Sequence, residues 1–305
     1  MTGTGERSVL LVTHTGRNEA VDLVRRIAER LHAAGVTVRA LDDEAGALEQ
    51  VVGSLPLQAV QHLGAAEDVE LVLVLGGDGT LLRAAELGRE SGTPLLGVNL
   101  GHVGFLAEAE PDVADTVVDA VLAGTWTVDE RGTVDVAVSV DGQAIFHGWA
   151  LNEVSLEKSD RARMVECALG IDGRPLVTFA ADGVLVSTAT GSTAYAFSAG
   201  GPVIWPDVDA MLVVPLAAHA LFARPLVVSP SSVVAIEVLA GESAAMLACD
   251  GRRTVAVPAH ARVEVTGGSR TVRLARIQDA AFTDRLVRKF GLPVHGWRGR
   301  NGRRT

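Results

Sequence analysis

The chain has 305 residues and a formal net charge of −10, from 27 basic and 37 acidic side chains. At about 150 residues per domain this length predicts two domains, and the acidic balance argues against a nucleic-acid partner. Hydrophobic residues at 48% and charged residues at 21% exclude a disordered chain. The apolar runs are too short to span a bilayer, and the N-terminus lacks a signal-peptide pattern. With only Cys167 and Cys249, which cannot form a disulfide framework, we expect a cytoplasmic protein without a membrane partner.

The first third of the chain alternates short apolar runs with segments of helical periodicity. Strands are predicted at 8–13, 36–41, 71–75 and 94–99, and helices at 19–34 and 80–90. Strands that alternate with helices imply βαβ units and a parallel sheet. We therefore predict an α/β N-terminal domain over residues 1–122.

Beyond residue 122, polar and apolar residues alternate as in half-buried strands. Asp-Gly pairs separate such segments at 141–142, 172–173 and 250–251. Asp-Gly between alternating segments is the strongest short-range signal for a β-hairpin. We therefore predict an antiparallel all-β C-terminal domain over residues 123–277. Helical spacing returns at 282–290, with Thr283 as the expected N-cap, and residues 299–305 form a basic tail predicted to be disordered.

The pentapeptide Gly76-Gly77-Asp78-Gly79-Thr80 follows the apolar run 71–75 directly. A strand that meets a helix marks the ligand-binding end of a parallel α/β sheet, and glycines at a helix N-terminus favour phosphate. A carboxylate repels phosphate, so Asp78 suits a kinase in which it holds an acceptor hydroxyl and takes its proton. The alternative is a tight strand-to-helix turn with Asp78 near the N-cap.

Three further segments are candidate site elements. The Gly-rich turn at 101–105 is interpreted as a structural loop, and Asn152-Glu153 fits a strand end or loop. The run 182–202 is rich in hydroxyls and contains Tyr195, which suits a nucleotide or else a loop with a short capped helix. His219 is interpreted as a core or loop histidine and the cysteines as inert core thiols. Metal-ligand spacing is absent, so we expect a divalent ion to arrive with nucleotide phosphates.

Together these segments resemble the ATP-NAD kinase family, whose members phosphorylate NAD to NADP. The resemblance rests on GGDGT at 76–80, NLGHVGFL at 99–106, Asn152-Glu153 and DGVLVSTATGSTAYAFSAGGP at 182–202. It implies a terminal helix that returns to the first domain, so that segment 278–298 completes it. GGDGT also occurs in lipid kinases. A GGDGT-type lipid kinase and a non-catalytic NAD-binding sensor therefore stand as alternatives.

The resemblance implies a role for each residue around GGDGT. Asp78 resembles the catalytic aspartate that takes the proton of the adenosine-ribose 2′-hydroxyl of NAD, and Gly79 lies against the substrate beside it. Arg83, one helical turn on, is expected to meet phosphate. The phosphate loop is completed by Gly76, Gly77 and Thr80.

The remaining matched residues are implied to bind NAD. Asn152 and Glu153 look like the pair that binds the adenine or ribose portion, Arg163 resembles a phosphate or ribose contact, and Asp182 resembles the aspartate at the nicotinamide end. Ala217 falls where the family has a backbone contact from a neighbouring subunit. The loop that lines the NAD site is matched by Thr193, Ala194, Tyr195, Ala196, Phe197 and Ser198.

The resemblance also implies the partners of the chain. We expect NAD as acceptor, ATP or inorganic polyphosphate as donor, Mg²⁺ carried by the nucleotide rather than by protein ligands, and a homodimer or homotetramer. A chain of net charge −10 that handles two polyanionic nucleotides must supply local positive charge, and we expect it from loop amides, Mg²⁺, Arg83 and Arg163.

Overall fold

The computed structural model describes residues 6–13, 18–52, 54–99, 104–106, 114–160, 163–239, 245–277 and 281–294. The chain forms two compact units. The first contains residues 1–130 and 272–305, and the second contains residues 131–271. Both ends of the chain therefore belong to the first unit.

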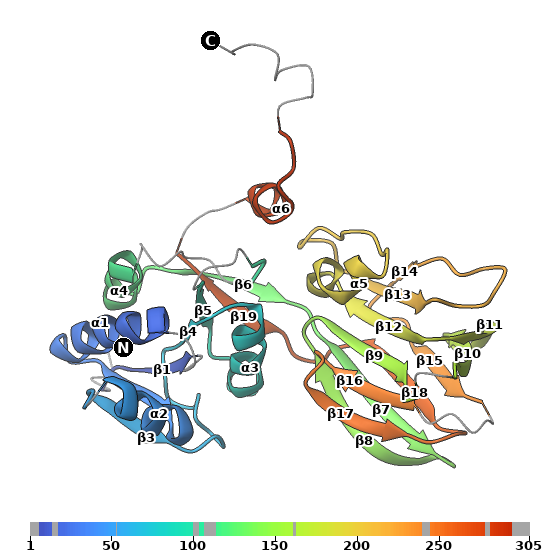
Figure 1. Ribbon diagram of the computed structural model, residues 1–305, viewed down its shortest axis with the longest axis horizontal. Helices are drawn as coiled ribbons and strands as arrows, with labels where there is room; N and C mark the ends of the chain where they lie inside the picture. Colours follow the sequence, from blue (N-terminus) through green and yellow to red (C-terminus); the bar gives the residue numbers. More distant parts are fainter. Residues whose placement is uncertain are drawn as a thin grey trace, which may run out of the picture. The chain divides into compact units, whose positions relative to one another are not determined.

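The first unit is built on a seven-stranded sheet (Figure 1). Its strands are β1 (Ser8–Thr13), β2 (Thr37–Leu41), β3 (Leu57–Val60), β4 (Leu71–Leu75), β5 (Leu95–Val98), β6 (Thr127–Arg131) and β19 (Val272–Arg276), in the order β3-β2-β1-β4-β5-β19-β6. β1 pairs in parallel with β2 and β4, and β5 pairs in parallel with β4 and β19. The predicted parallel sheet is confirmed. The strand order reverses between β1 and β4, and such a switch point is where open α/β sheets bind ligands.

Helices cover both faces of this sheet. The unit contains α1 (Asn18–Ala33), α2 (Asp42–Val52), α3 (Asp78–Gly88), α4 (Ala114–Ala123) and α6 (Phe282–Phe290). Leu23 and Ile27 of α1 and Val121 of α4 share one apolar cluster with Leu71 and Leu73 of β4. Because side chains alternate across a strand, Val72 faces the opposite side, where it lies beside Gly88 of α3.

Two strands lie outside the predicted boundaries. The sequence pattern placed 127–131 and 272–276 in the second domain, whereas β6 and β19 belong to the sheet of the first unit. Alternation identifies a strand but not its partner, and the partner here is distant: Leu274 pairs with Leu95. The predicted N-cap of α6 is wrong, because Ala281 occupies that position and Thr283 lies within the helix.

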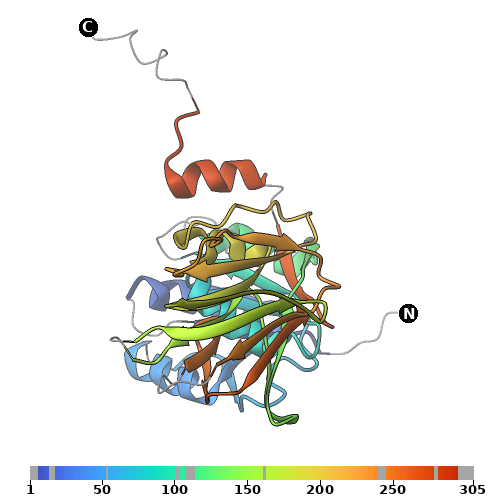
Figure 2. The ribbon, with the colours of Figure 1, turned by 90° about the vertical axis from the view of Figure 1, so that its right-hand side faces the viewer.

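The second unit contains two six-stranded sheets, in the orders β11-β10-β15-β18-β7-β8 and β14-β13-β12-β9-β16-β17. The strands are β7 (Val134–Val140), β8 (Gln143–Ala150), β9 (Glu153–Lys158), β10 (Val165–Ile171), β11 (Arg174–Ala181), β12 (Gly183–Thr188), β13 (Met211–Leu216), β14 (Leu226–Val228), β15 (Val234–Val238), β16 (Ala245–Cys249), β17 (Arg253–Val257) and β18 (Arg262–Gly267). Apolar side chains of both sheets, such as Val136 and Val186, form one core. Figure 2 shows these strands in green, yellow and orange. The predicted antiparallel β architecture is confirmed.

The three Asp-Gly pairs lie at hairpin turns as predicted. The aspartates have φ values of 50°, 53° and 54°, and the glycines also have positive φ. Positive φ at both positions is typical of the two-residue type I′ turn. Cys167 and Cys249 are buried and unbridged, and burial raises the pKa of Cys167 to about 12, which fits inert core thiols. In the described part of the chain, each helix is too short or too polar to cross a membrane.

Candidate functional site

The GGDGT pentapeptide connects β4 to α3 at the switch point of the first sheet. The Gly76 amide donates to the Val98 carbonyl of β5 at 2.9 Å, which fixes the turn between neighbouring strands. Gly77 is the N-cap of α3 and Asp78 is the first helical residue. Asp78 therefore lies next to the N-cap in a tight strand-to-helix turn, and its carboxylate also contacts a second segment of the chain.

The Asp78 carboxylate is bound by a second glycine turn. It accepts hydrogen bonds from the Phe105 amide at 3.3 Å and the Leu106 amide at 3.2 Å. A Cβ on Gly104 would overlap Asp78 Oδ1, so glycine permits this approach. The sequence pattern assigned this turn to a structural loop and missed its contact with Asp78. The available signal was its position after β5, because the carboxyl ends of adjacent parallel strands share one sheet edge. Residues 101–103 of the turn lie outside the described residues.

Arg83 forms an ion pair with a buried carboxylate. Its guanidinium pairs with Glu44 and also donates to the Thr13 carbonyl at 3.0 Å. Glu44 is 3% exposed, and burial raises its pKa although the Thr13 amide and Arg83 oppose that shift. The pairing offsets much of the positive charge of Arg83. The expected contact of Arg83 with phosphate stays a prediction. A phosphate bound there would contact a guanidinium that is already paired with Glu44.

In the second unit, Asn152 and Glu153 lie at the start of β9, and each is 8% exposed. The hairpin residue Asp250 holds this bend, because its carboxylate accepts from the Leu151 amide at 3.0 Å and the Asn152 amide at 2.7 Å. Arg253 donates to the same carboxylate at 2.9 Å. The sequence pattern identified Asp250 only as a turn residue. Its support of Asn152-Glu153 could not be read from spacing, because the two segments lie about a hundred residues apart.

Glu153 has the most perturbed carboxyl group of this bend. Its pKa is raised to about 8, first by burial and then by the nearby charges of Asp250 and Glu157, while the Tyr195 amide opposes the shift. Its Oε2 atom has no hydrogen-bond partner among the described residues. At neutral pH the group is therefore largely protonated, and it can donate as well as accept a hydrogen bond.

The hydroxyl-rich run folds as two short helices after β12, η2 (Thr190–Thr193) and α5 (Tyr195–Ser198). Several hydroxyls serve the fold: Thr188 Oγ1 donates to the Leu151 carbonyl at 2.6 Å and Ser187 Oγ to the Asn152 carbonyl at 3.0 Å. These bonds bring the run against Asn152-Glu153. Both aromatic side chains of α5 are presented to solvent, with Tyr195 40% and Phe197 39% exposed.

The remaining predicted residues lie around the ends of β12 and β13. Asp182 pairs with Lys158 at 2.5 Å, and its amide donates to the Leu216 carbonyl at 2.9 Å, which places it beside Ala217. Ala217 is exposed and has a φ of 46°. His219 is an exposed loop residue whose amide donates to Ala180. Arg163 is exposed and precedes β10.

Two family models match the chain. The model of the ATP-NAD kinase N-terminal domain matches residues 9–126, and the model of the ATP-NAD kinase C-terminal domain matches residues 151–277. The NAD kinase of Thermobifida fusca is 54% identical over 99% of this chain and 94% of its own length. The NAD kinase of Mycobacterium tuberculosis is 53% identical over 97% of this chain and 100% of its own.

The chain belongs to the ATP-NAD kinase family. Solved structures agree with the family fold. An NAD kinase from Archaeoglobus fulgidus, solved with ATP, is similar with a TM-score of 0.70 at 25% identity, covering 94% of this chain and 100% of that one. A yeast NADH kinase, solved with NADH, is similar in fold with a TM-score of 0.86 at 21% identity, covering 96% of this chain and 89% of that one.

In this ATP-NAD kinase family member, Gly191 is expected to be essential for packing the TGSTAY segment. A Cβ there would overlap the Asn152 carbonyl and Ser187 Oγ, which are held by the hydrogen bonds described above. We expect Gly191→Ala to lower the free energy of unfolding by about 1–3 kcal/mol and to raise the KM for NAD. Denaturant titration and initial-rate kinetics measure both effects. The control is Gly46→Ala, because Gly46 lies in α2 and a Cβ added there would meet open space. That change is expected to stabilise by about 0.5–1 kcal/mol. A Gly191→Ala variant that behaves like Gly46→Ala would contradict the packing argument.

Proposed function

We propose that this chain is an ATP-dependent NAD kinase that phosphorylates the 2′-hydroxyl of the adenosine ribose. The observation that carries the proposal is the position of Asp78, which is fixed at the start of α3, at the switch point of the sheet, by two backbone amides. A carboxylate has about four lone-pair directions, so two of them stay available for a substrate hydroxyl. Membership of the ATP-NAD kinase family supports a ribose hydroxyl of NAD as that group.

In the proposed reaction, Asp78 accepts the proton of the 2′-hydroxyl while the ribose oxygen attacks the γ-phosphorus of ATP. The bond from the γ-phosphorus to the β,γ-bridging oxygen breaks, and ADP leaves. We assign Gly76, Gly77 and Thr80 to the phosphate loop, because the N-terminus of α3 favours anions, and Gly79 to the substrate contact beside Asp78. Asp78 orients the hydroxyl and accepts its proton, and positioning of the nucleophile is one of the main protein contributions in phosphoryl transfer.

For NAD recognition we assign the second unit. Glu153 supports this assignment because its side chain is buried, largely protonated and, within the described part of the chain, unpartnered at Oε2. Such a group offers a donor to a ring nitrogen or hydroxyl. We assign Asn152 and Glu153 to the adenine or ribose portion and Asp182 to the nicotinamide end. The exposed ring of Tyr195 suits stacking on adenine. We further assign Arg163, Thr193, Ala194, Ala196, Phe197, Ser198 and Ala217 to the NAD site.

We propose that the divalent ion enters with ATP. Among the described residues there is no group of three or more His, Cys, Asp or Glu side chains that could hold a metal. Mg²⁺ is commonly bound through one or two carboxylates together with substrate phosphates. Such an ion would neutralise charge on the phosphates. We also propose ATP as the main donor with polyphosphate as a second one, a cytoplasmic location, and a homodimer or homotetramer.

The direct test is incubation of the purified chain with NAD, ATP and Mg²⁺, with chromatographic detection of NADP. We expect NADP and ADP in equal amounts, and loss of the reaction when a chelator removes the ion. NAD binding by calorimetry without turnover would instead indicate a sensor, and phosphorylation of a diacylglycerol without NADP would indicate a lipid kinase. Parallel reactions with NADH and polyphosphate define the substrate range, and light scattering measures the oligomer.

A further inference from the structure

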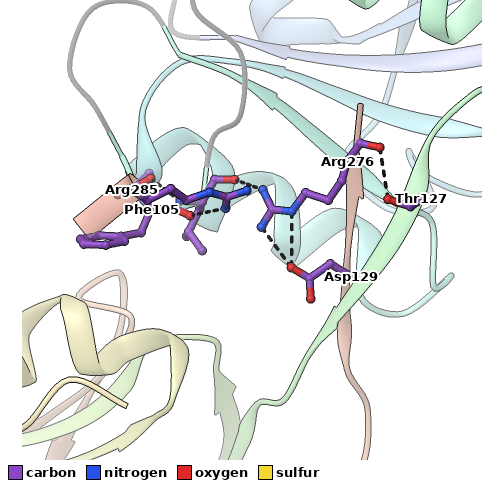
Figure 3. Close-up of polar contacts among 7 residues, drawn as sticks. Phe105, Thr127, Asp129, Arg276 and Arg285 are labelled. Atoms are coloured by element: carbon purple, nitrogen blue, oxygen red, sulfur yellow. Dashed lines mark hydrogen bonds and ion pairs between the residues drawn. The ribbon is translucent and has the colours of Figure 1, made fainter. Parts of the chain in front are cut away.

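One peptide group lies between α6 and Asp78. The Leu106 amide donates to Asp78 Oδ1 at 3.2 Å, and the carbonyl at the other end of the same peptide group, that of Phe105, accepts from Arg285 Nη1 at 3.1 Å. Figure 3 shows the guanidinium of Arg285 directed at this carbonyl. A cation on the carbonyl oxygen strengthens the N–H dipole at the opposite end, because hydrogen bonds in a chain polarise one another.

Three aromatic rings fix α6 to the same segment. The Phe105 ring lies 5.9 Å from the Phe282 ring and 5.8 Å from the Phe290 ring, centroid to centroid. Residues 282, 285 and 290 are spaced so that they lie on one face of a helix. α6 has no buried residue of its own and is seen along its length in Figure 2. The aromatic contacts therefore set the helix where Arg285 reaches the Phe105 carbonyl.

A second arginine holds the next carbonyl. Arg276 Nη1 donates to the Leu106 carbonyl at 3.1 Å, and Arg276 is 8% exposed. Its other nitrogens donate to Asp129 Oδ2 on β6, at 3.4 Å from Nε and 3.3 Å from Nη2 (Figure 3). Arg276 therefore anchors the segment to the sheet, while Arg285 acts on the peptide group that donates to Asp78.

We propose that Arg285 is a positioning residue that orients the Asp78 carboxylate through the peptide group between Phe105 and Leu106. This inference rests on the proposed function, in which Asp78 takes the proton of the 2′-hydroxyl. In this proposal α6 helps to hold the Asp78 carboxylate in place, although the helix and Asp78 are about two hundred residues apart in sequence. Since Arg285 acts in this proposal on the Phe105 carbonyl rather than on a nucleotide, its removal is expected to change the rate of the chemical step more than the binding of either nucleotide.

The test is an Arg285→Met variant of the full chain, which keeps the length of the side chain and removes its charge and donors. We expect kcat for NADP formation to fall about 5- to 20-fold, with the KM values for NAD and ATP within about twofold of the parent. Arg285→Lys keeps a donor and is expected to recover part of the loss. The matched control is Arg288→Met, an exposed arginine of the same helix, for which we expect kcat within about twofold of the parent.

A double mutant separates positioning from a general structural effect. If Arg285 acts through Asp78, Arg285→Met causes little further loss in an Asp78→Asn background, since effects of residues that act as a unit are not additive. The same fractional loss in both backgrounds, or a kcat like that of Arg288→Met, overturns the inference. A parent chain that makes no NADP overturns the proposed function instead, so the two failures are distinguishable.

Discussion

An Asp78→Asn variant is expected to form NADP at least about 10²-fold more slowly than the parent chain, the usual scale for loss of a general base. The amide has the shape of the carboxylate but cannot take a proton from the 2′-hydroxyl. Its oxygen still accepts from one of the two amides that the carboxylate binds, while its NH₂ group faces the other. We therefore expect the loss in kcat, with a small change in the free energy of unfolding.

Initial rates with saturating NAD and ATP measure the effect, and a denaturant titration shows that the fold is retained. Asp22→Asn is the control, because it makes the same change of charge at an exposed position on α1 of the same unit. An Asp78→Asn variant that matches the parent, while Asp22→Asn does too, contradicts the role of Asp78 as proton acceptor.

Glu153→Gln is expected to change how the stability of the second unit depends on pH. The pKa of Glu153 is raised from 4.5 to about 8, so the folded chain keeps a proton that the unfolded chain has lost. Between these values each unit of rising pH lowers the free energy of unfolding by about 1.4 kcal/mol. Over the whole interval the penalty is on the order of 5 kcal/mol, and it is absent below pH 4.5. A glutamine does not titrate, so the variant should gain stability over the parent as pH rises from 5 to 8.

Hydrogen exchange at the amides of β9 and β16 measures this change within the second unit. Glu166→Gln is the control, because Glu166 is an exposed residue of β10. The pKa of Asp250 is also raised, chiefly by burial. Ionisation of Asp250 therefore lowers the free energy of unfolding of the parent and of the variant alike. A Glu153→Gln stability difference that is the same at pH 5 and pH 8 would mean that Glu153 carries no such penalty.

Much of the fold follows from local pattern. Continuous apolar runs identified the parallel strands β1, β4 and β5, and Asp-Gly turns identified three hairpins, because both signals lie within a few residues. Sheet membership was not predictable for β6 and β19, which pair with strands distant in sequence. The predicted N-cap of α6 is wrong because Thr283 has the chemistry of a cap but lies two positions after Ala281, as the second residue of the helix.

For the candidate site, too, local motifs identify some residues, and contacts between distant segments supply the others. Asp78, Asn152 and Glu153 were chosen from motifs, whereas the groups that hold them, Asp250 and Arg285, come from other parts of the chain. Their role depends on hydrogen bonds to backbone atoms, which leave no side-chain pattern in a single sequence. For Arg83 the motif could not reveal the pairing with Glu44, because that carboxylate lies on another helix and no local spacing links the two.

The second unit is an insertion between residues 130 and 272 of the first, and this has a consequence for protein synthesis. β19 and α6, which carry Arg276 and Arg285, emerge from the ribosome after every other described strand and helix. A nascent chain, or one cleaved after residue 271, possesses the GGDGT loop and the TGSTAY segment but lacks both arginines that hold Phe105 and Leu106. Synthesis of β19 and α6, rather than folding of the second unit, is then the step at which the segment that binds Asp78 gains its two arginine contacts.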